Sequence, residues 1–66
     1  MPKENGKVVR WDGGYGFIER ETKGKDLYFN KFDLRKGFSV FVGARVKYEI
    51  GQGVKGNEKA MKVRII

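Results

Sequence analysis

Apolar and polar residues alternate along two stretches in the second half of the chain, at about 44–50 and 59–65. A period of two places one face of a strand in the core and the other in solvent. Both stretches therefore predict β-strands. Their inward-facing residues would be Val46, Tyr48, Ile50, Met61, Val63 and Ile65.

Short β-prone runs recur along the chain at roughly ten-residue spacing, as in small barrels and sandwiches. Ten Gly and one Pro interrupt the sequence, and no stretch long enough for an amphipathic helix shows helical spacing without a Gly inside it. We predict one all-β domain over residues 1–66, with residues 1–5 as a flexible tail. The strands are expected at about 6–12, 15–20, 26–30, 44–50 and 59–65, with an irregular link over 31–43.

Aromatic residues concentrate in the second and third predicted strands. Tyr15 and Phe17 stand two positions apart and share a face, while Ile18 points the other way, toward the core. In the third strand Phe29 suits the core, which turns Tyr28 outward. Antiparallel pairing of these strands would place Tyr15, Phe17 and Tyr28 side by side.

An exposed row of rings within a basic surface is what single-stranded nucleic acid needs, because bases stack on rings and cations contact phosphates. Lys7, Arg10, Lys25 and Lys31 would frame the row. The same spacing also fits half-buried packing between neighbouring strands. Two such segments with interleaved Gly favour exposure.

The charge balance bears on the partner rather than on the fold. Fifteen Lys and Arg against eight Asp and Glu give a net charge of +7, which attracts polyanions such as nucleic acid. A solvated basic surface without a ligand would account for the charge alone equally well.

Missing residue types exclude several kinds of site. With no Cys and no His, the chain has no disulfide, thiolate zinc site, Ser–His relay or Cys nucleophile. Its carboxylates are scattered, so we expect no enzyme activity, no metal and no cofactor. No apolar run approaches the roughly 20 residues that span a bilayer, and no signal-like segment opens the chain. We expect a cytoplasmic monomer with no membrane partner and no small-molecule substrate.

Two motifs resemble those of the cold-shock domain family. The run Gly14-Tyr15-Gly16-Phe17-Ile18 resembles its first ribonucleoprotein-type motif, usually K-G-F-G-F-I. The run Leu27-Tyr28-Phe29-Asn30-Lys31 stands where its second motif, usually V-F-V-H-F, is found. The resemblance extends over about residues 6–63 and includes a G-x-x-V-x-F-like fourth strand beginning at Gly43.

The resemblance implies a five-stranded antiparallel OB-type barrel that binds single-stranded RNA and DNA. It implies stacking at Tyr15, Phe17 and Tyr28, a further aromatic contact at Phe38, and a phosphate contact at Lys7. The full set of candidate nucleic-acid-binding residues is Lys7, Arg10, Trp11, Tyr15, Phe17, Tyr28, Asn30, Lys31, Phe38 and Lys55.

The chain departs from the family pattern just before the first motif and within the second. The family's Trp-Phe pair in the first strand is Arg10-Trp11 here. Which of the two faces the ligand depends on strand register and on a possible β-bulge. The second motif's His is Asn30 and its last Phe is Lys31, with Phe32 one position later and expected to face elsewhere. Binding should therefore depend more on charge and fall faster with salt.

We predict an RNA chaperone that holds strands single by mass action, with weak sequence preference. Two alternatives remain. One is an architectural protein that coats duplex DNA. The other is a protein-interaction module that uses the aromatic row as a peptide groove.

Overall fold

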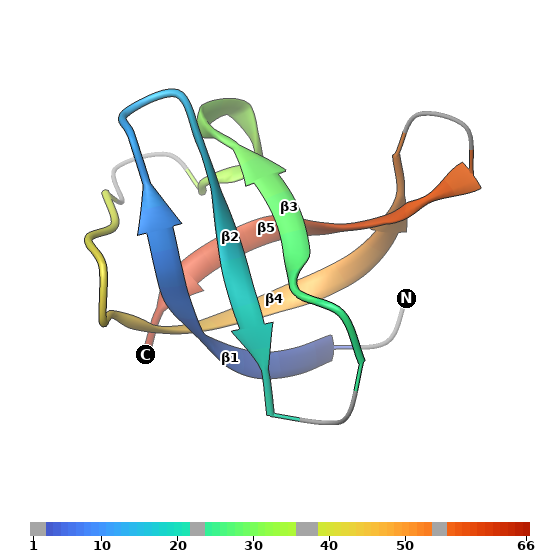
Figure 1. Ribbon diagram of the computed structural model, residues 1–66, viewed down its shortest axis with the longest axis horizontal. Coiled ribbons are helices and arrows are strands. Elements are labelled where there is room, and N and C mark those ends of the chain that lie inside the picture. Colours follow the sequence, from blue (N-terminus) through green and yellow to red (C-terminus); the bar gives the residue numbers. More distant parts are fainter. Residues whose placement is uncertain (1–2, 22–23, 36–38, 54–55) are drawn as a thin grey trace.

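The computed structural model describes residues 3–21, 24–35, 39–53 and 56–66. Five strands form a closed barrel in the order β1-β2-β3-β5-β4 (Figure 1). They are β1 (Lys3–Trp11), β2 (Tyr15–Arg20), β3 (Leu27–Asn30), β4 (Arg45–Gln52) and β5 (Glu58–Ile65), with a 3₁₀ turn η1 (Lys31–Asp33) after β3. The predicted all-β barrel is confirmed.

The predicted antiparallel arrangement needs one correction, at the seam that closes the barrel. β3 and β5 run parallel and pair through Tyr28 and Lys59. The other four pairings are antiparallel. The parallel seam arises because the long connection after β3 carries the chain across the barrel before β4 and β5 form a hairpin.

Strand β1 begins earlier than predicted. Lys3 pairs with Glu49 and Asn5 pairs with Lys47 of β4. The expectation of a flexible tail is therefore wrong for residues 3–5. This segment has no apolar alternation to mark it as a strand, and the backbone partner that orders it lies more than forty residues away.

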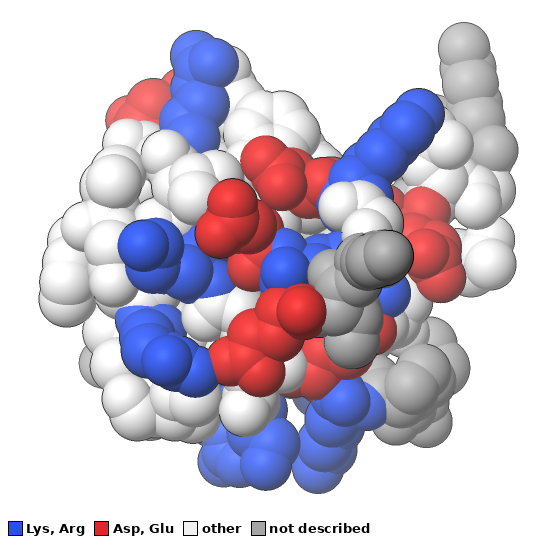
Figure 2. Space-filling view, turned by 60° about the horizontal axis from the view of Figure 1, so that its bottom comes forward, with Lys and Arg blue, Asp and Glu red and all other residues white. Residues whose placement is uncertain are grey.

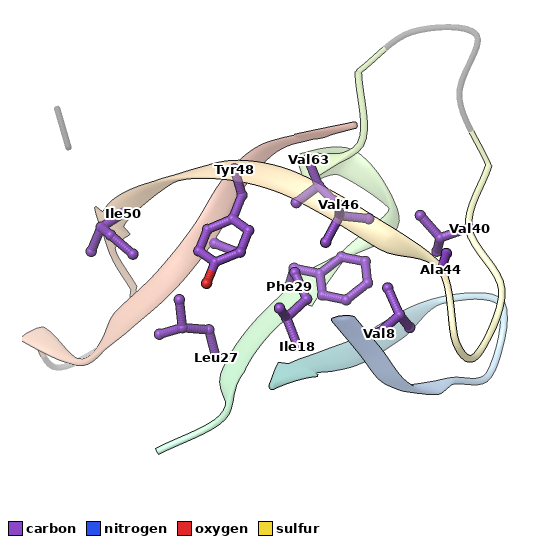
Figure 3. Close-up of a cluster of buried hydrophobic side chains, with 11 residues drawn as sticks. Val8, Ile18, Leu27, Phe29, Val40, Ala44, Val46, Tyr48, Ile50 and Val63 are labelled. Atoms are coloured by element: carbon purple, nitrogen blue, oxygen red, sulfur yellow. The ribbon is translucent and has the colours of Figure 1, made fainter. Parts of the chain in front are cut away.

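The core fills the barrel mainly with residues that the alternation predicted to face inward, but the prediction is wrong for Met61. Met61 is half-buried and pairs with Glu49, whereas Ala60 pairs with the buried Ile50 and enters the core in its place. Tyr48 is buried in the core, as are Ile18 and Phe29 (Figure 3). Burying such side chains contributes about 1.5–3 kcal/mol each. The buried hydrophobic residues are Val8, Ile18, Leu27, Phe29, Val40, Ala44, Val46, Tyr48, Ile50, Ala60 and Val63.

A polar network lies at the lower end of the barrel in Figure 1, where β1 begins and β2 ends. Arg20 donates to Glu4 twice, from Nε to Oε1 at 2.9 Å and from Nη2 to Oε2 at 2.6 Å. The Tyr48 hydroxyl donates to Glu4 Oε1 at 3.1 Å. The network ties β1, β2 and β4 together and satisfies the one polar atom that Tyr48 brings into the core.

A β-bulge in β1 decides the orientation that the sequence left open. Val8 pairs with Ile18 and Arg10 pairs with Phe17, so Val9 is the extra residue. Beyond the bulge the alternation is reversed. Arg10 faces outward and Trp11 faces inward, against Phe29.

Candidate nucleic-acid interface

The strand register places three rings together on the outer face of β2 and β3. Phe17 and Tyr28 are direct cross-strand partners, and Tyr15 stands two residues before Phe17 on the same face. The ring centroids are 6.0 Å apart for Tyr15 and Tyr28, 6.0 Å for Phe17 and Tyr28, and 6.2 Å for Tyr15 and Phe17. The three form a compact triangle, which we call the ring cluster.

The ring cluster remains open to solvent. Tyr28 is 40% exposed, and Tyr15 and Phe17 are half-buried. Arg10 is exposed, pairs with Phe17, and holds its guanidinium carbon 5.8 Å from the centre of the Tyr15 ring. A cation over an aromatic face beside open rings can hold a phosphate while bases stack.

Hydrogen bonds within the turn between β1 and β2 hold the backbone at Tyr15, the first residue of the ring cluster. The carboxylate of Asp12 accepts hydrogen bonds from the backbone N–H groups of Gly14 and Tyr15, both at 3.0 Å. These two donors lower the pKa of Asp12, since they favour its charged form. The N–H of Lys31 donates to the Gly14 carbonyl at 2.8 Å, which joins the turn to the end of β3.

Asn30 has a structural function at the end of β3. Its Oδ1 accepts from the Phe32 N–H at 2.8 Å, while its own N–H donates to Asp33 Oδ2 at 3.0 Å. This reciprocal pair caps η1. Asn30 still borders the ring cluster, because it pairs with Tyr15 across the strands.

Two residues of η1 present a ring and a charge beside this edge. Phe32 is 82% exposed, and Lys31 places its ammonium 5.3 Å from the centre of that ring. Phe32 was not among the predicted binding residues. The signal that points to it is the family motif's last Phe, displaced by one position.

A hollow of about 610 Å³ lies beside Tyr28, between β3 and the β4–β5 hairpin. The hairpin contributes polar side chains that sequence reasoning missed, because they approach β3 only through the parallel seam. Lys59 anchors this wall by an ion pair with Asp33, Nζ to Oδ2 at 2.8 Å. The hollow is lined by Tyr28, Asn30, Gln52, Gly53, Asn57, Glu58 and Lys59.

Acidic side chains gather at the lower end of the molecule. In the view from below, red side chains occupy the middle of the surface and blue ones lie mainly around them (Figure 2). Glu4 and Arg20 are paired there, and Glu21 pairs with Arg45. A polyanion is therefore favoured on the sides of the barrel rather than at this end.

The structure brings some predicted site residues together and separates others. Arg10, Tyr15, Phe17 and Tyr28 form one surface, with Asn30 and Lys31 at its edge. Lys7 faces outward farther along β1, opposite Glu19. Trp11 is half-buried and lies apart from the three rings, stacked on Phe29. Phe38 and Lys55 lie outside the described residues.

The described part of the chain lacks two features that other classes of protein carry. It contains no helix with the length and apolar character needed to cross a membrane. Nor does it hold three or more carboxylate, thiol or imidazole side chains grouped as metal ligands.

The closed five-stranded barrel defines the class of fold, and comparison with known proteins identifies the family. The family described as "'Cold-shock' DNA-binding domain" matches residues 4–66. The chain therefore belongs to the cold-shock domain family, a family of nucleic-acid-binding domains and not of enzymes. The resemblance inferred from the two motifs is confirmed.

One curated relative and one solved structure illustrate the similarity. A cold shock-like protein of Aquifex aeolicus (strain VF5) is 33% identical over 64 residues, which cover 89% of this chain and 90% of that protein. The structure of drosophila Unr CSD456 matches 100% of this chain with a TM-score of 0.84 at 15% identity, and this chain spans 27% of its length. The second comparison supports the fold.

Proposed function

We propose that this domain binds single-stranded RNA and DNA on the ring cluster, with weak sequence preference, and acts as an RNA chaperone. The observation that carries the proposal is three mutually contacting, solvent-open rings with a guanidinium above one of them. Stacking on such rings is worth roughly 1–3 kcal/mol per base and tolerates any base.

The cations around the rings support the phosphate part of this mechanism. Arg10 lies over Tyr15, and Lys31 lies over Phe32 at the end of β3. Holding an unpaired strand here lowers the population of hairpins by mass action and needs neither ATP nor a cofactor. The domain would act as a monomer, because the ring cluster and the Arg10 beside it come from β1, β2 and β3 of one chain. Its proposed location is the cytoplasm.

The test removes two rings and keeps the barrel. Phe17→Ala with Tyr28→Ala should weaken binding of oligo-dT by about tenfold or more, from the loss of stacking. Fluorescence anisotropy of a labelled strand measures this, and circular dichroism checks the fold. Phe41→Ala is the matched control, since Phe41 is 62% exposed and lies outside the ring cluster. Unchanged affinity in the folded double variant would rule out stacking.

Salt dependence separates this function from a peptide-binding groove. For a single strand the logarithm of the binding constant should fall linearly with the logarithm of salt concentration, by about 0.7 for each phosphate contacted. A dry peptide groove would show little salt dependence. A hairpin whose melting temperature falls as the protein is added would support chaperone activity.

A further inference from the structure

A second basic surface lies on the opposite side of the barrel from the ring cluster. Its side chains come from the outer face of β4 and β5, the first residue of β1 and the segment after η1. In Figure 1 these parts of β4 and β5 lie behind β2 and β3. A narrow hollow of about 50 Å³ is lined by Lys3, Arg35, Lys47, Lys62 and Arg64, with Tyr48 and Glu49.

Strand alternation and register bring these cations together. Lys47 and Arg64 are direct partners on neighbouring antiparallel strands. Lys3 pairs with Glu49, two residues along β4 from Lys47. Like charges placed directly opposite each other destabilise a sheet. The fold therefore maintains a repulsive pair that a bound anion would relieve.

Few carboxylates offset this charge. Lys62 approaches Glu49 with its Nζ 3.9 Å from Oε2. Among the described residues, no carboxylate lies within ion-pair distance of Lys3, Arg35, Lys47 or Arg64. Lys47 and Arg64 are also half-buried, so their side chains lie along the surface instead of extending freely into water. Five cations against one carboxylate leave a strong local positive potential.

The backbone at Lys62 contributes to the same arrangement. Its φ of 53° is the only positive φ of a non-glycine residue in the described chain. The left-handed conformation lies within β5, where Ala60 and Val63 are both buried although three positions apart. It lets the strand keep both residues in the core while Lys62 projects from the basic face.

The ligand must be recognised by its charge, because no exposed ring lines this surface among the described residues. The one aromatic residue there, Tyr48, is 1% exposed and points into the core. A duplex suits such a surface better than a single strand. Its bases are already stacked, and it carries one negative charge per about 1.7 Å of axis.

We propose that this surface binds the phosphate backbone of a nucleic-acid duplex. The domain would then hold a single strand on the ring cluster and a duplex on the opposite side, as at the junction between a stem and a loop. The inference does not require the ring cluster to bind a strand, because duplex binding is measured directly.

The test titrates the protein with a blunt-ended DNA duplex, alone and after saturation with oligo-dT. The duplex should bind in both cases and perturb the amide NMR signals of Lys47, Lys62 and Arg64. In Lys47→Gln with Arg64→Gln, duplex affinity should fall about tenfold, and the salt slope should become less steep by about two. Oligo-dT affinity should change by less than about twofold.

A matched variant removes two positive charges beside the ring cluster instead of two from the second basic surface. Arg10→Gln with Lys31→Gln should weaken oligo-dT binding more than duplex binding. The Lys47 and Arg64 variant should fold, since it removes a repulsive pair, and its melting temperature reports this directly.

Three results would overturn the proposal. They are unchanged duplex affinity in the folded Lys47 and Arg64 variant, displacement of the duplex by oligo-dT from wild-type protein, and binding of phosphatidylserine vesicles without binding of the duplex. Failure of oligo-dT alone to bind would contradict the function of the ring cluster and leave the duplex titration as a valid test.

Discussion

Trp11 and Phe29 stack face to face, with ring centroids 5.3 Å apart and planes inclined by 6°. Between their strands lies Gly16, which pairs with both residues. The indole occupies the space that a side chain on Gly16 would need. This stack lies across β2 from the ring cluster's outer face, so Trp11 packs behind the strand that carries Tyr15 and Phe17.

Trp11→Phe should therefore weaken the fold more than the binding. Replacing the half-buried, stacked indole by the smaller phenyl ring should cost about 1 kcal/mol of unfolding free energy. Oligo-dT affinity should stay within about twofold of wild type. Urea unfolding measures the first quantity and fluorescence anisotropy the second. A loss of affinity of about tenfold, as expected for Phe17→Ala with Tyr28→Ala, without loss of stability would mean that the indole contacts the ligand.

Gly16→Ala should destabilise the barrel by about 1–3 kcal/mol through overpacking. An added Cβ would collide with the carbonyl oxygen of Arg10 and lie 3.0 Å from Cε3 of Trp11. Gly14→Ala is the matched control, because its Cβ would meet only Asp12 Oδ1 at 3.8 Å. That control should change stability by less than about 0.5 kcal/mol. Equal melting temperatures for the two variants would contradict this account of Gly16.

The features that depend on the local sequence pattern of glycines and alternating apolar residues were predicted correctly. The predicted bounds of β2 coincide with the observed Tyr15–Arg20, because Gly and alternation mark both ends. The row of Tyr15, Phe17 and Tyr28 follows from the same alternation and an antiparallel partner. Burial of Tyr48 follows from its position between Val46 and Ile50.

What was missed depends on contacts between distant parts of the chain. One extra residue, Val9, reverses the orientation of Arg10 and Trp11, and nothing in the composition of β1 marks it as a bulge. Residues 3–5 become a strand only because β4 offers a backbone partner. The hollow beside Tyr28 exists only because β3 and β5 pair in parallel.

Two Arg–Glu pairs of different burial should differ in their contribution to stability. Arg20 and Glu4 form two hydrogen bonds with side chains 15% and 18% exposed, whereas Arg45 and Glu21 are 63% and 49% exposed. Arg20→Gln should cost about 1.5–3 kcal/mol of unfolding free energy. The Glu4 carboxylate, which is largely shielded from water, would lose the two charged hydrogen bonds that Arg20 donates to it. Arg45→Gln should cost less than about 1 kcal/mol. Denaturant titration of both variants tests the comparison, and equal costs would contradict a supporting function of the Arg20 network.

The polar network of Arg20, Glu4 and Tyr48 also predicts that the barrel loses stability at high pH, because Tyr48 then loses its proton. Burial, and then the hydrogen bond to Glu4, raise the pKa of Tyr48 well above its ordinary value. The folded chain therefore retains this proton at pH values where the unfolded chain has released it. Stability is fully present below about pH 10, the ordinary tyrosine value, and falls as the pH rises above it, by at most about 1.4 kcal/mol per pH unit.

Tyr48→Phe isolates this contribution. The variant should lose about 1 kcal/mol near neutral pH, through the missing hydrogen bond to Glu4. Above about pH 10 it should lose stability less steeply than wild type, since it has no proton to release at this position. Urea unfolding at a series of pH values measures the difference between the two proteins, which removes effects common to both. Parallel curves would show that the Tyr48 hydroxyl keeps an ordinary pKa in the folded barrel.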